Sequence, residues 1–249
     1  TAFVGADNCE IGKDVGQYIV NRLGGKGKIL EITGLEGSTP AMERHRGLAD
    51  ALKAEPGIEI TASVDGAWLQ SVAGEKMDSI LQDNKDINLV FAQNDRMAVG
   101  AYLSARQRQL EKEMLFVGID ALPGKGYGVE QVLEGVLDAT FIYPTGGDKV
   151  MQVAMDILEK RPYERDTKLS TALVDKTNAR VMQLQTDHIT VCCLIGDHRP
   201  CVLDKEPDEH GVIPSKETIG GTTRPTDQPL QAVGRGDSCQ TGLLYECFS

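Results

Sequence analysis

The chain has 249 residues, 41% of them hydrophobic, and a formal net charge of −11 at pH 7. Such a chain can bury a substantial core as one large or two smaller domains. It has no cluster of Lys and Arg to displace the counterions of a nucleic acid, and no run of about 18 apolar residues that could cross a bilayer. We therefore expect a globular protein with no nucleic acid partner. Its first residues do not read as a signal peptide.

Short apolar runs alternate with segments of helical periodicity from residue 1 to about 185. We expect strands near 2–6, 28–33, 58–64, 88–93, 114–119, 138–143 and 170–174. We expect helices near 10–23, 40–54, 68–83, 96–108, 125–135 and 146–160. Strands that alternate with helices through short connections are typical of βαβ units. The sequence thus predicts an α/β fold, a parallel sheet flanked by helices, over residues 1–185.

The character of the sequence changes after residue 185. Residues 186–249 hold five of the six cysteines, three of the four histidines and half of the ten prolines. They show no sustained periodicity, so we expect an irregular and poorly ordered tail. Its candidate metal ligands are Cys192, Cys193, His198, Cys201 and His210. Their spacing fits no standard zinc finger, and no metal site is expected.

Polar side chains follow five successive predicted strands. In chain order they are Glu43, Arg44, His45 and Arg46 at the front of a helix, then Asp65 and Trp68, then Gln93, Asn94 and Asp95, then Asp120, and finally Tyr143. The carboxyl ends of parallel strands meet at one edge of a sheet, where ligands bind. We therefore expect these side chains to converge on a binding site.

The residue types at this edge suit a polyhydroxylated ligand. Carboxylates, amides and guanidinium groups pair with hydroxyls, and a planar ring stacks on the C–H face of a sugar. Each residue also has a purely structural interpretation. The arginines suit a solvated helix surface, Asp95 a helix N-cap, Trp68 the core, Asp120 a turn and Tyr143 a hinge. Their joint placement favours the binding interpretation.

Catalytic patterns are weak in this sequence. His45 is the only histidine before the tail, and no serine lies in a nucleophile elbow, so a Ser-His-Asp arrangement lacks parts. The glycines around Lys26 precede a strand, which is the reverse of the order in a phosphate-binding loop. We expect no enzyme activity and no cofactor.

Five segments resemble the ribose-binding-protein group of type I periplasmic sugar-binding proteins. They are Ala6-Asp-Asn, Gly37-Ser-Thr-Pro-Ala-Met-Glu-Arg-His-Arg-Gly47, Val90-Phe-Ala-Gln-Asn-Asp95, Gly118-Ile-Asp120 and Leu137-Asp-Ala-Thr140. In that family two α/β lobes joined by three crossovers close on a sugar. The resemblance implies that Arg46, Asn94 and Asp120 bind hydroxyls and that Trp68 stacks on the ring. Tyr143 stands where the family often places a glutamine at the third crossover.

The resemblance also implies an incomplete clamp. Residues 7–143 correspond to a nearly complete second lobe, and residues 145–168 to a helix and strand of a first lobe, most of which this chain lacks. Monosaccharide binding by the chain alone is therefore expected to be weak. The helix sequences and the run from Arg180 resemble the periplasmic sensor domain of hybrid two-component histidine kinases, which suggests a membrane kinase or a permease as partner. The alternative is the effector-binding core of a lactose-repressor-type regulator.

Overall fold

A computed structural model describes residues 1–184 of the chain. The predicted tail, residues 186–249, lies outside the described residues, as do its candidate metal ligands. Within residues 1–184, no group of three or more His, Cys, Asp and Glu side chains is arranged to hold a metal ion. No helix in this part of the chain is both long and apolar enough to span a membrane.

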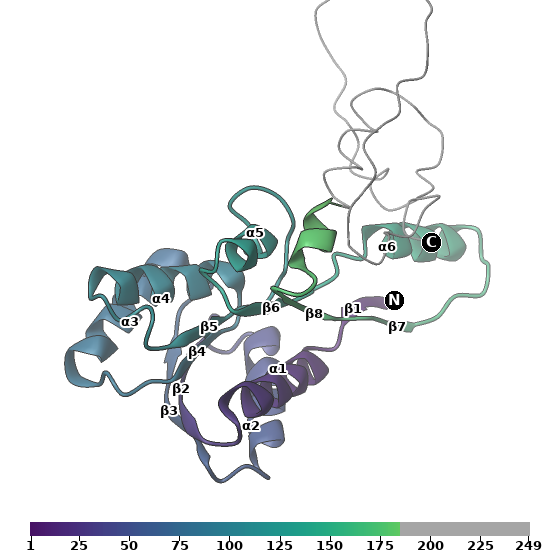
Figure 1. The fold of residues 1–249 in the computed structure, drawn as a ribbon. Coiled ribbons are helices and arrows are strands. Elements are labelled where there is room, and N and C mark those ends of the chain that lie inside the picture. Colours follow the sequence, from purple (N-terminus) through teal and green to yellow (C-terminus); the bar gives the residue numbers. More distant parts are fainter. Residues whose placement is uncertain (185–249) are drawn as a thin grey trace, which may run out of the picture.

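A six-stranded sheet forms the centre of the fold (Figure 1). Its strands are β2 (Gly27–Thr33), β3 (Ile58–Asp65), β4 (Leu89–Ala92), β5 (Leu115–Val117), β6 (Ala139–Phe141) and β8 (Leu173–Asp175). They lie in the order β3-β2-β4-β5-β6-β8. The first five are parallel, and β8 runs antiparallel to β6. The carboxyl ends of five neighbouring strands thus share one edge.

Helices cover both faces of this sheet. The helices α1 (Asn8–Leu23) and α2 (Thr39–Leu52) lie on one face, and α3 (Gln70–Asp83), α4 (Asp95–Gln107) and α5 (Gly128–Leu133) on the other (Figure 1). Successive strand residues alternate between the two cores, as the twofold period of a strand requires. Val90 packs with the α3–α4 core and Phe91 with the α1–α2 core.

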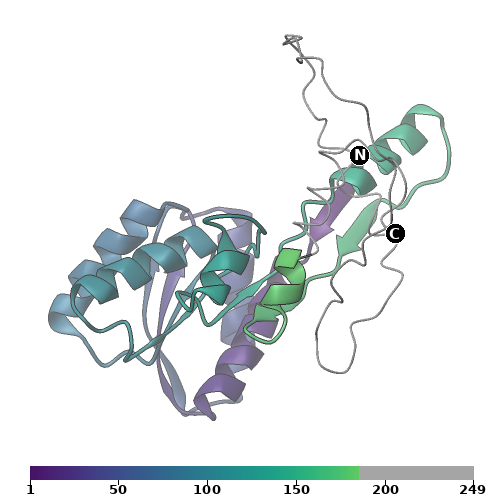
Figure 2. The same cartoon turned by 45° about the horizontal axis from the view of Figure 1, so that its top comes forward.

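A second, smaller unit stands beside the six-stranded sheet (Figures 1 and 2). It consists of β1 (Phe3–Ala6), paired in parallel with β7 (Asp166–Leu169), and the helix α6 (Gly147–Leu158). Five apolar side chains of α6 are exposed, namely Val150, Met151, Met155, Ile157 and Leu158. The burial of Val153 alone on this helix shows that most of its apolar face is uncovered among the described residues.

The predicted α/β fold with flanking helices is confirmed, and each predicted helix appears within a few residues of its expected position. Two details differ. The strand expected near 170–174 is the shorter β8, and its antiparallel direction departs from an all-parallel sheet. The periodicity missed β7, because Asp166-Thr-Lys-Leu has a single buried residue, Thr167, and therefore little apolar alternation. The family resemblance did place a strand in this region.

Candidate ligand-binding site

Arg44 is a buried charged side chain at the shared strand edge, with an exposed fraction of 5%. It lies on α2, and its Nε donates a hydrogen bond to Asn8 Oδ1 at 3.0 Å. Its Nη1 donates to the main-chain carbonyl of Gln93. The guanidinium carbon lies 5.6 Å from the ring centroid of Trp68 and 5.1 Å from that of Tyr143. Two aromatic rings and two hydrogen bonds therefore fix its position.

Asp120 follows β5 at the same edge. Its main-chain N–H donates to the Phe141 carbonyl at 2.9 Å, and its carbonyl accepts from the Tyr143 N–H at 3.2 Å. Its φ of 128° lies in a region that residues other than glycine rarely adopt. Strained backbone of this kind occurs mainly at functional sites, where the surrounding structure imposes it.

Asn94 and Trp68 contact each other across the ends of β3 and β4. Asn94 caps α4, because its Oδ1 accepts from the Met97 N–H at 2.8 Å. Its Nδ2 donates to the Trp68 carbonyl at 3.4 Å. The half-buried Trp68 ring lies against Gly34, where a Cβ would come within 2.0 Å of the ring. Because glycine has no Cβ, position 34 leaves room for the indole ring at the rim of the site.

The structure brings together four of the five residues predicted for the site, Trp68, Asn94, Asp120 and Tyr143, but not Arg46. Arg46 is exposed on α2, and its interaction with the Cys9 side chain on α1 raises its pKa. Arg44 stands among the other four instead. Arg46 therefore does not lie with the other predicted residues, and its predicted contact with a sugar hydroxyl stays a prediction. The alternative that Arg44 is a solvated surface residue is wrong, because Arg44 is buried.

Gln93 was expected to face the ligand edge, but it is fully buried beneath it. Its Nε2 donates to Glu31 Oε1 and to the Ala41 carbonyl, both at 3.1 Å, and its Oε1 accepts from the Gly34 N–H at 3.0 Å. Glu31 Oε2 in turn pairs with His45 Nδ1 at 2.6 Å. These polar side chains form a supporting layer under the site, and their hydrogen bonds leave Gln93 no free group for a ligand.

The charges of Arg44 and Asp120 influence each other's pKa, but the two side chains form no ion pair among residues 1–184. A guanidinium has five N–H donors, of which Arg44 uses one on Asn8 and one on Gln93. The Asp120 carboxylate makes no hydrogen bond to any described residue. Arg44 thus has unused donors and Asp120 an unused acceptor, which are the two kinds of group that pair with a ligand hydroxyl.

Burial changes the pKa values of these charged groups. It lowers the pKa of the Arg44 guanidinium, an effect that the charges of Asp120, Tyr143 and Asp95 oppose. It raises the pKa of Asp120 to about 6, against the opposing charge of Arg44. It raises the pKa of the neighbouring Asp95 to about 8, although a hydrogen bond from Thr140 acts in the other direction.

Because the pKa values of Asp95 and Asp120 are raised, we expect the free energy of unfolding to decrease as the pH rises. These two groups bind their protons more tightly in the folded chain than in the unfolded chain. Their contribution to stability is therefore complete below the ordinary carboxyl pKa of about 4, and it is lost progressively up to about pH 6 for Asp120 and about pH 8 for Asp95. We expect the thermal unfolding midpoint to drop by about 5 °C or more between pH 5 and pH 9. Calorimetry at several pH values measures this, and Asp95→Asn should remove the part of the decrease that falls between pH 6 and pH 8. A midpoint that is constant over this range would contradict the prediction.

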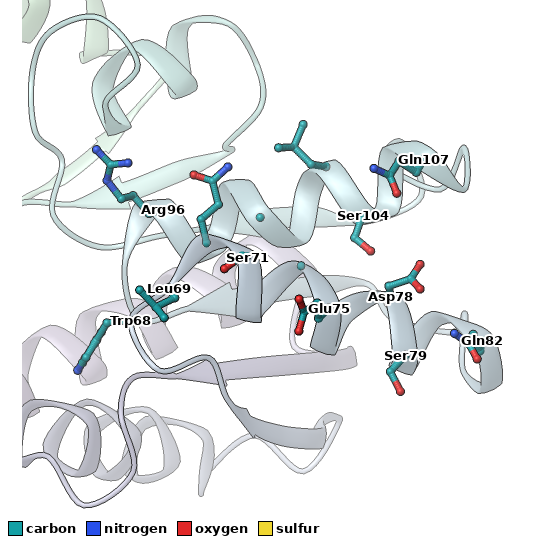
Figure 3. A pocket seen from close by; sticks show the side chains of 14 residues that line it. Trp68, Leu69, Ser71, Glu75, Asp78, Ser79, Gln82, Arg96, Ser104 and Gln107 are labelled. Atoms are coloured by element: carbon teal, nitrogen blue, oxygen red, sulfur yellow. The ribbon is translucent and has the colours of Figure 1, made fainter.

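A much larger concavity lies elsewhere on the described chain. A groove of about 850 Å³ runs between α3 and α4, with Trp68 and Arg96 at one end and Gln82 and Gln107 at the other (Figure 3). Of the predicted site residues only Trp68 lines it. A cavity of about 50 Å³ beside Asp95 and Asp120 is far smaller than the 300–1,000 Å³ typical of ligand pockets. The strand edge is thus one open wall of a site, which nothing closes among residues 1–184.

Comparison with known proteins gives a consistent result. The model of the periplasmic binding protein domain family matches residues 1–162. The structure titled as the fructose-binding periplasmic domain of the hybrid two-component system BT1754 is 58% identical, with a TM-score of 0.77, over 78% of this chain and 65% of that chain.

Curated sugar-binding proteins are more distant relatives. The ribose import binding protein RbsB of Salmonella typhimurium is 31% identical over 70% of this chain and 57% of its own length. The galactofuranose-binding protein YtfQ of Escherichia coli is 32% identical over 54% of this chain and 42% of its own length. The chain thus spans about half the length of the curated relatives it matches. With the family model covering 162 of its 249 residues, the chain belongs to the periplasmic binding protein domain family.

Proposed function

We propose that the chain binds a monosaccharide at the carboxyl ends of its strands, without catalysis, and that it does so in the periplasm. The observation that carries the proposal is Arg44, which lies beside the rings of Trp68 and Tyr143, has unused donors and interacts electrostatically with Asp120. Guanidinium and carboxylate groups recognise adjacent hydroxyls, and the indole offers a face for the C–H groups of a sugar ring. Relatives named for ribose, galactofuranose and fructose support this ligand class.

We further propose that sugar binding serves sensing rather than transport. The support is the 58% identity to a domain of a hybrid two-component system, against 31–32% for the import and galactofuranose-binding proteins. The partner would then be a histidine kinase in the membrane rather than a permease. Fructose is the first sugar to test, because the fructose-binding domain of that system is the relative of higher identity.

A further lobe completes the site in this proposal. The six-stranded sheet and the helices α1 to α5 make up what we call the large lobe. Among the described residues, the exposed apolar face of α6 and the two-stranded sheet of β1 and β7 lie outside it. The relatives are longer than the matched region, which leaves room in them for such a lobe. We propose that it packs on α6 and supplies the opposite wall of the sugar site.

The chain alone should therefore bind sugar weakly. Each hydrogen bond to a charged group contributes about 1.5–3 kcal/mol, and association costs offset much of the gain from two or three of them. A millimolar Kd corresponds to about −4 kcal/mol, and we expect fructose to bind in this range. Titration followed by NMR should show saturable shifts of the Trp68 indole N–H and of the Asp120 backbone.

The acyclic polyol mannitol serves as the control, because it carries hydroxyls without a ring face for stacking. Ribose and galactose are titrated beside fructose to compare hexoses and pentoses. If no monosaccharide produces saturable shifts at the strand edge up to about 100 mM, the proposal fails. Micromolar binding by the chain alone would contradict the expectation that half of the site is missing.

A further inference from the structure

Asp95 connects three chain segments by hydrogen bonds next to the proposed sugar site: the start of α4, the turn after β5, and β6. It is the first residue of α4 and is 5% exposed. Its carboxyl group accepts a hydrogen bond from Thr140 Oγ1 on β6 at 2.6 Å and from the Ala121 N–H, in the turn after β5, at 2.9 Å. Its own N–H donates to the Ile119 carbonyl at 2.8 Å.

The surrounding backbone is shaped around this carboxyl group. A Cβ at Gly118 would lie 2.2 Å from one carboxylate oxygen of Asp95, and a Cβ at Gly128 would lie 1.9 Å from the other. Both distances are well inside the contact distance of two heavy atoms. Two glycines from different segments thus leave a space that only the Asp95 side chain fills.

The turn that Asp95 holds is the one that carries Asp120. Asp120 and Ala121 have φ values of 128° and 50°, so two consecutive residues other than glycine adopt positive φ. Each such residue costs on the order of 1–3 kcal/mol unless the surrounding structure imposes it. The hydrogen bond from the Ala121 N–H to the Asp95 carboxyl is the side-chain contact that holds this turn.

We propose that Asp95 is the positioning residue of the site, which holds the Asp120–Ala121 turn in strained geometry so that the Asp120 carboxylate faces Arg44 and a ligand. Asp95 itself is buried, and each of its carboxyl oxygens accepts a hydrogen bond from the protein, one from Thr140 and one from Ala121. The binding half of this proposal rests on the proposed sugar-binding function. The positioning half concerns the free protein and stands on its own.

The proposal predicts a difference between two substitutions of Asp95. Because burial raises its pKa to about 8, the group is largely uncharged at pH 7. Asparagine matches it in shape and charge: its Oδ1 can accept from Ala121, and its Nδ2 can donate to the Thr140 hydroxyl. Alanine removes both contacts. We expect Asp95→Ala to weaken fructose binding about tenfold or more, and Asp95→Asn to restore it to within about threefold of the unchanged chain.

Asp138→Ala provides the matched control. Asp138 Oδ2 also accepts a hydrogen bond from a main-chain N–H, that of Phe116, at 3.0 Å, but at the opposite end of β5. Loss of this contact should lower the unfolding midpoint without changing the affinity. Asp95→Ser covers the case in which the alanine variant does not fold, because serine suits a helix N-terminus while its hydroxyl is too short to replace the carboxyl group.

Two measurements on the full chain decide the matter. In the absence of sugar, NMR follows hydrogen exchange of the Ala121 amide and the titration of the Asp120 carboxyl. We expect Asp95→Ala to lower the protection of Ala121 about tenfold or more and to shift the Asp120 titration, and Asp95→Asn to change neither. Fructose titrations then give the affinities.

The outcomes test the positioning of Asp120 by Asp95 separately from its effect on sugar binding. If Asp95→Ala, or Asp95→Ser in its place, leaves both the Ala121 exchange and the Asp120 titration unchanged, positioning by Asp95 is wrong. If it weakens sugar binding no more than Asp138→Ala does, its effect is general stability and the proposal is again overturned. If the unchanged chain binds no sugar, the proposed function fails, while the measurements on the free protein still decide whether Asp95 positions Asp120.

Discussion

Replacing Arg44 with alanine is expected to abolish measurable monosaccharide binding by this chain. The guanidinium supplies the unused donors opposite Asp120 and is the group that both Trp68 and Tyr143 contact. Losing two hydrogen bonds from a charged donor corresponds to about 3 kcal/mol or more, which is a loss of at least a hundredfold. A millimolar Kd would thereby move beyond what an NMR titration detects. The measurement is the fructose titration of the Trp68 indole N–H.

Arg46→Ala is the matched control, since it removes the same side chain two residues further along α2. Arg46 is exposed and directed to Cys9 on α1, so its loss should change the affinity by less than about twofold. Arg44→Lys tests whether charge alone is sufficient, because lysine cannot reproduce the planar, flanked guanidinium. We expect lysine to recover little. Equal losses of affinity in Arg46→Ala and Arg44→Ala would show that the site is assigned wrongly.

The comparison of Arg44 with Arg46 shows which features of the site can be predicted from the sequence. On α2 the buried residues are Ala41, Arg44, Gly47, Leu48 and Leu52. Arg44 follows Ala41 by three residues and precedes Leu48 by four, so helical spacing alone places it on the buried face. Arg46 falls on the opposite side. Applying the helical period to the polar residues, and not only to the apolar ones, would have identified Arg44 as the buried arginine.

The positions of strand ends were readily predictable, whereas the direction of single side chains was not. Trp68, Asn94, Asp120 and Tyr143 each follow a strand that the sequence pattern predicts, and parallel strands bring their ends together. Gln93 comes directly after such a run as well, yet it turns inward because Glu31 and the Gly34 N–H lie within hydrogen-bond distance. Those partners lie about 60 residues away in the chain, and no local pattern reveals them.

Asp95 is a second residue whose contacts could not be predicted from the sequence. Asp is a preferred N-cap, so the local pattern made it a candidate for capping α4. The structure assigns the cap to Asn94 and sends the Asp95 carboxyl to Ala121 and Thr140. These contacts connect residues 26 and 45 positions apart. The strained turn that they hold becomes visible only once the strands are assembled.

A chimera that supplies a complete first lobe is expected to bind fructose about a hundredfold to a thousandfold more tightly than this chain. The lobe can be taken from the BT1754 domain, of which this chain covers 65%. A second wall adds hydrogen bonds and excludes water, and about 3–4 kcal/mol would move a millimolar Kd into the micromolar range. Docking of the lobe would also bury the apolar face of α6, where Met151 and Leu158 are 63% and 75% exposed.

Substitutions on α6 separate lobe docking from sugar contact. Met151→Glu and Leu158→Glu place charges on this face, and burying an unpaired charge is costly. In the chimera they should lower the fructose affinity, since they weaken docking, whereas in the chain alone they should leave the weak affinity unchanged. Calorimetry on both proteins measures the two effects. A chimera that folds with both lobes yet binds no more tightly than the chain would mean that the large lobe carries the whole site, and that the exposed face of α6 has another role.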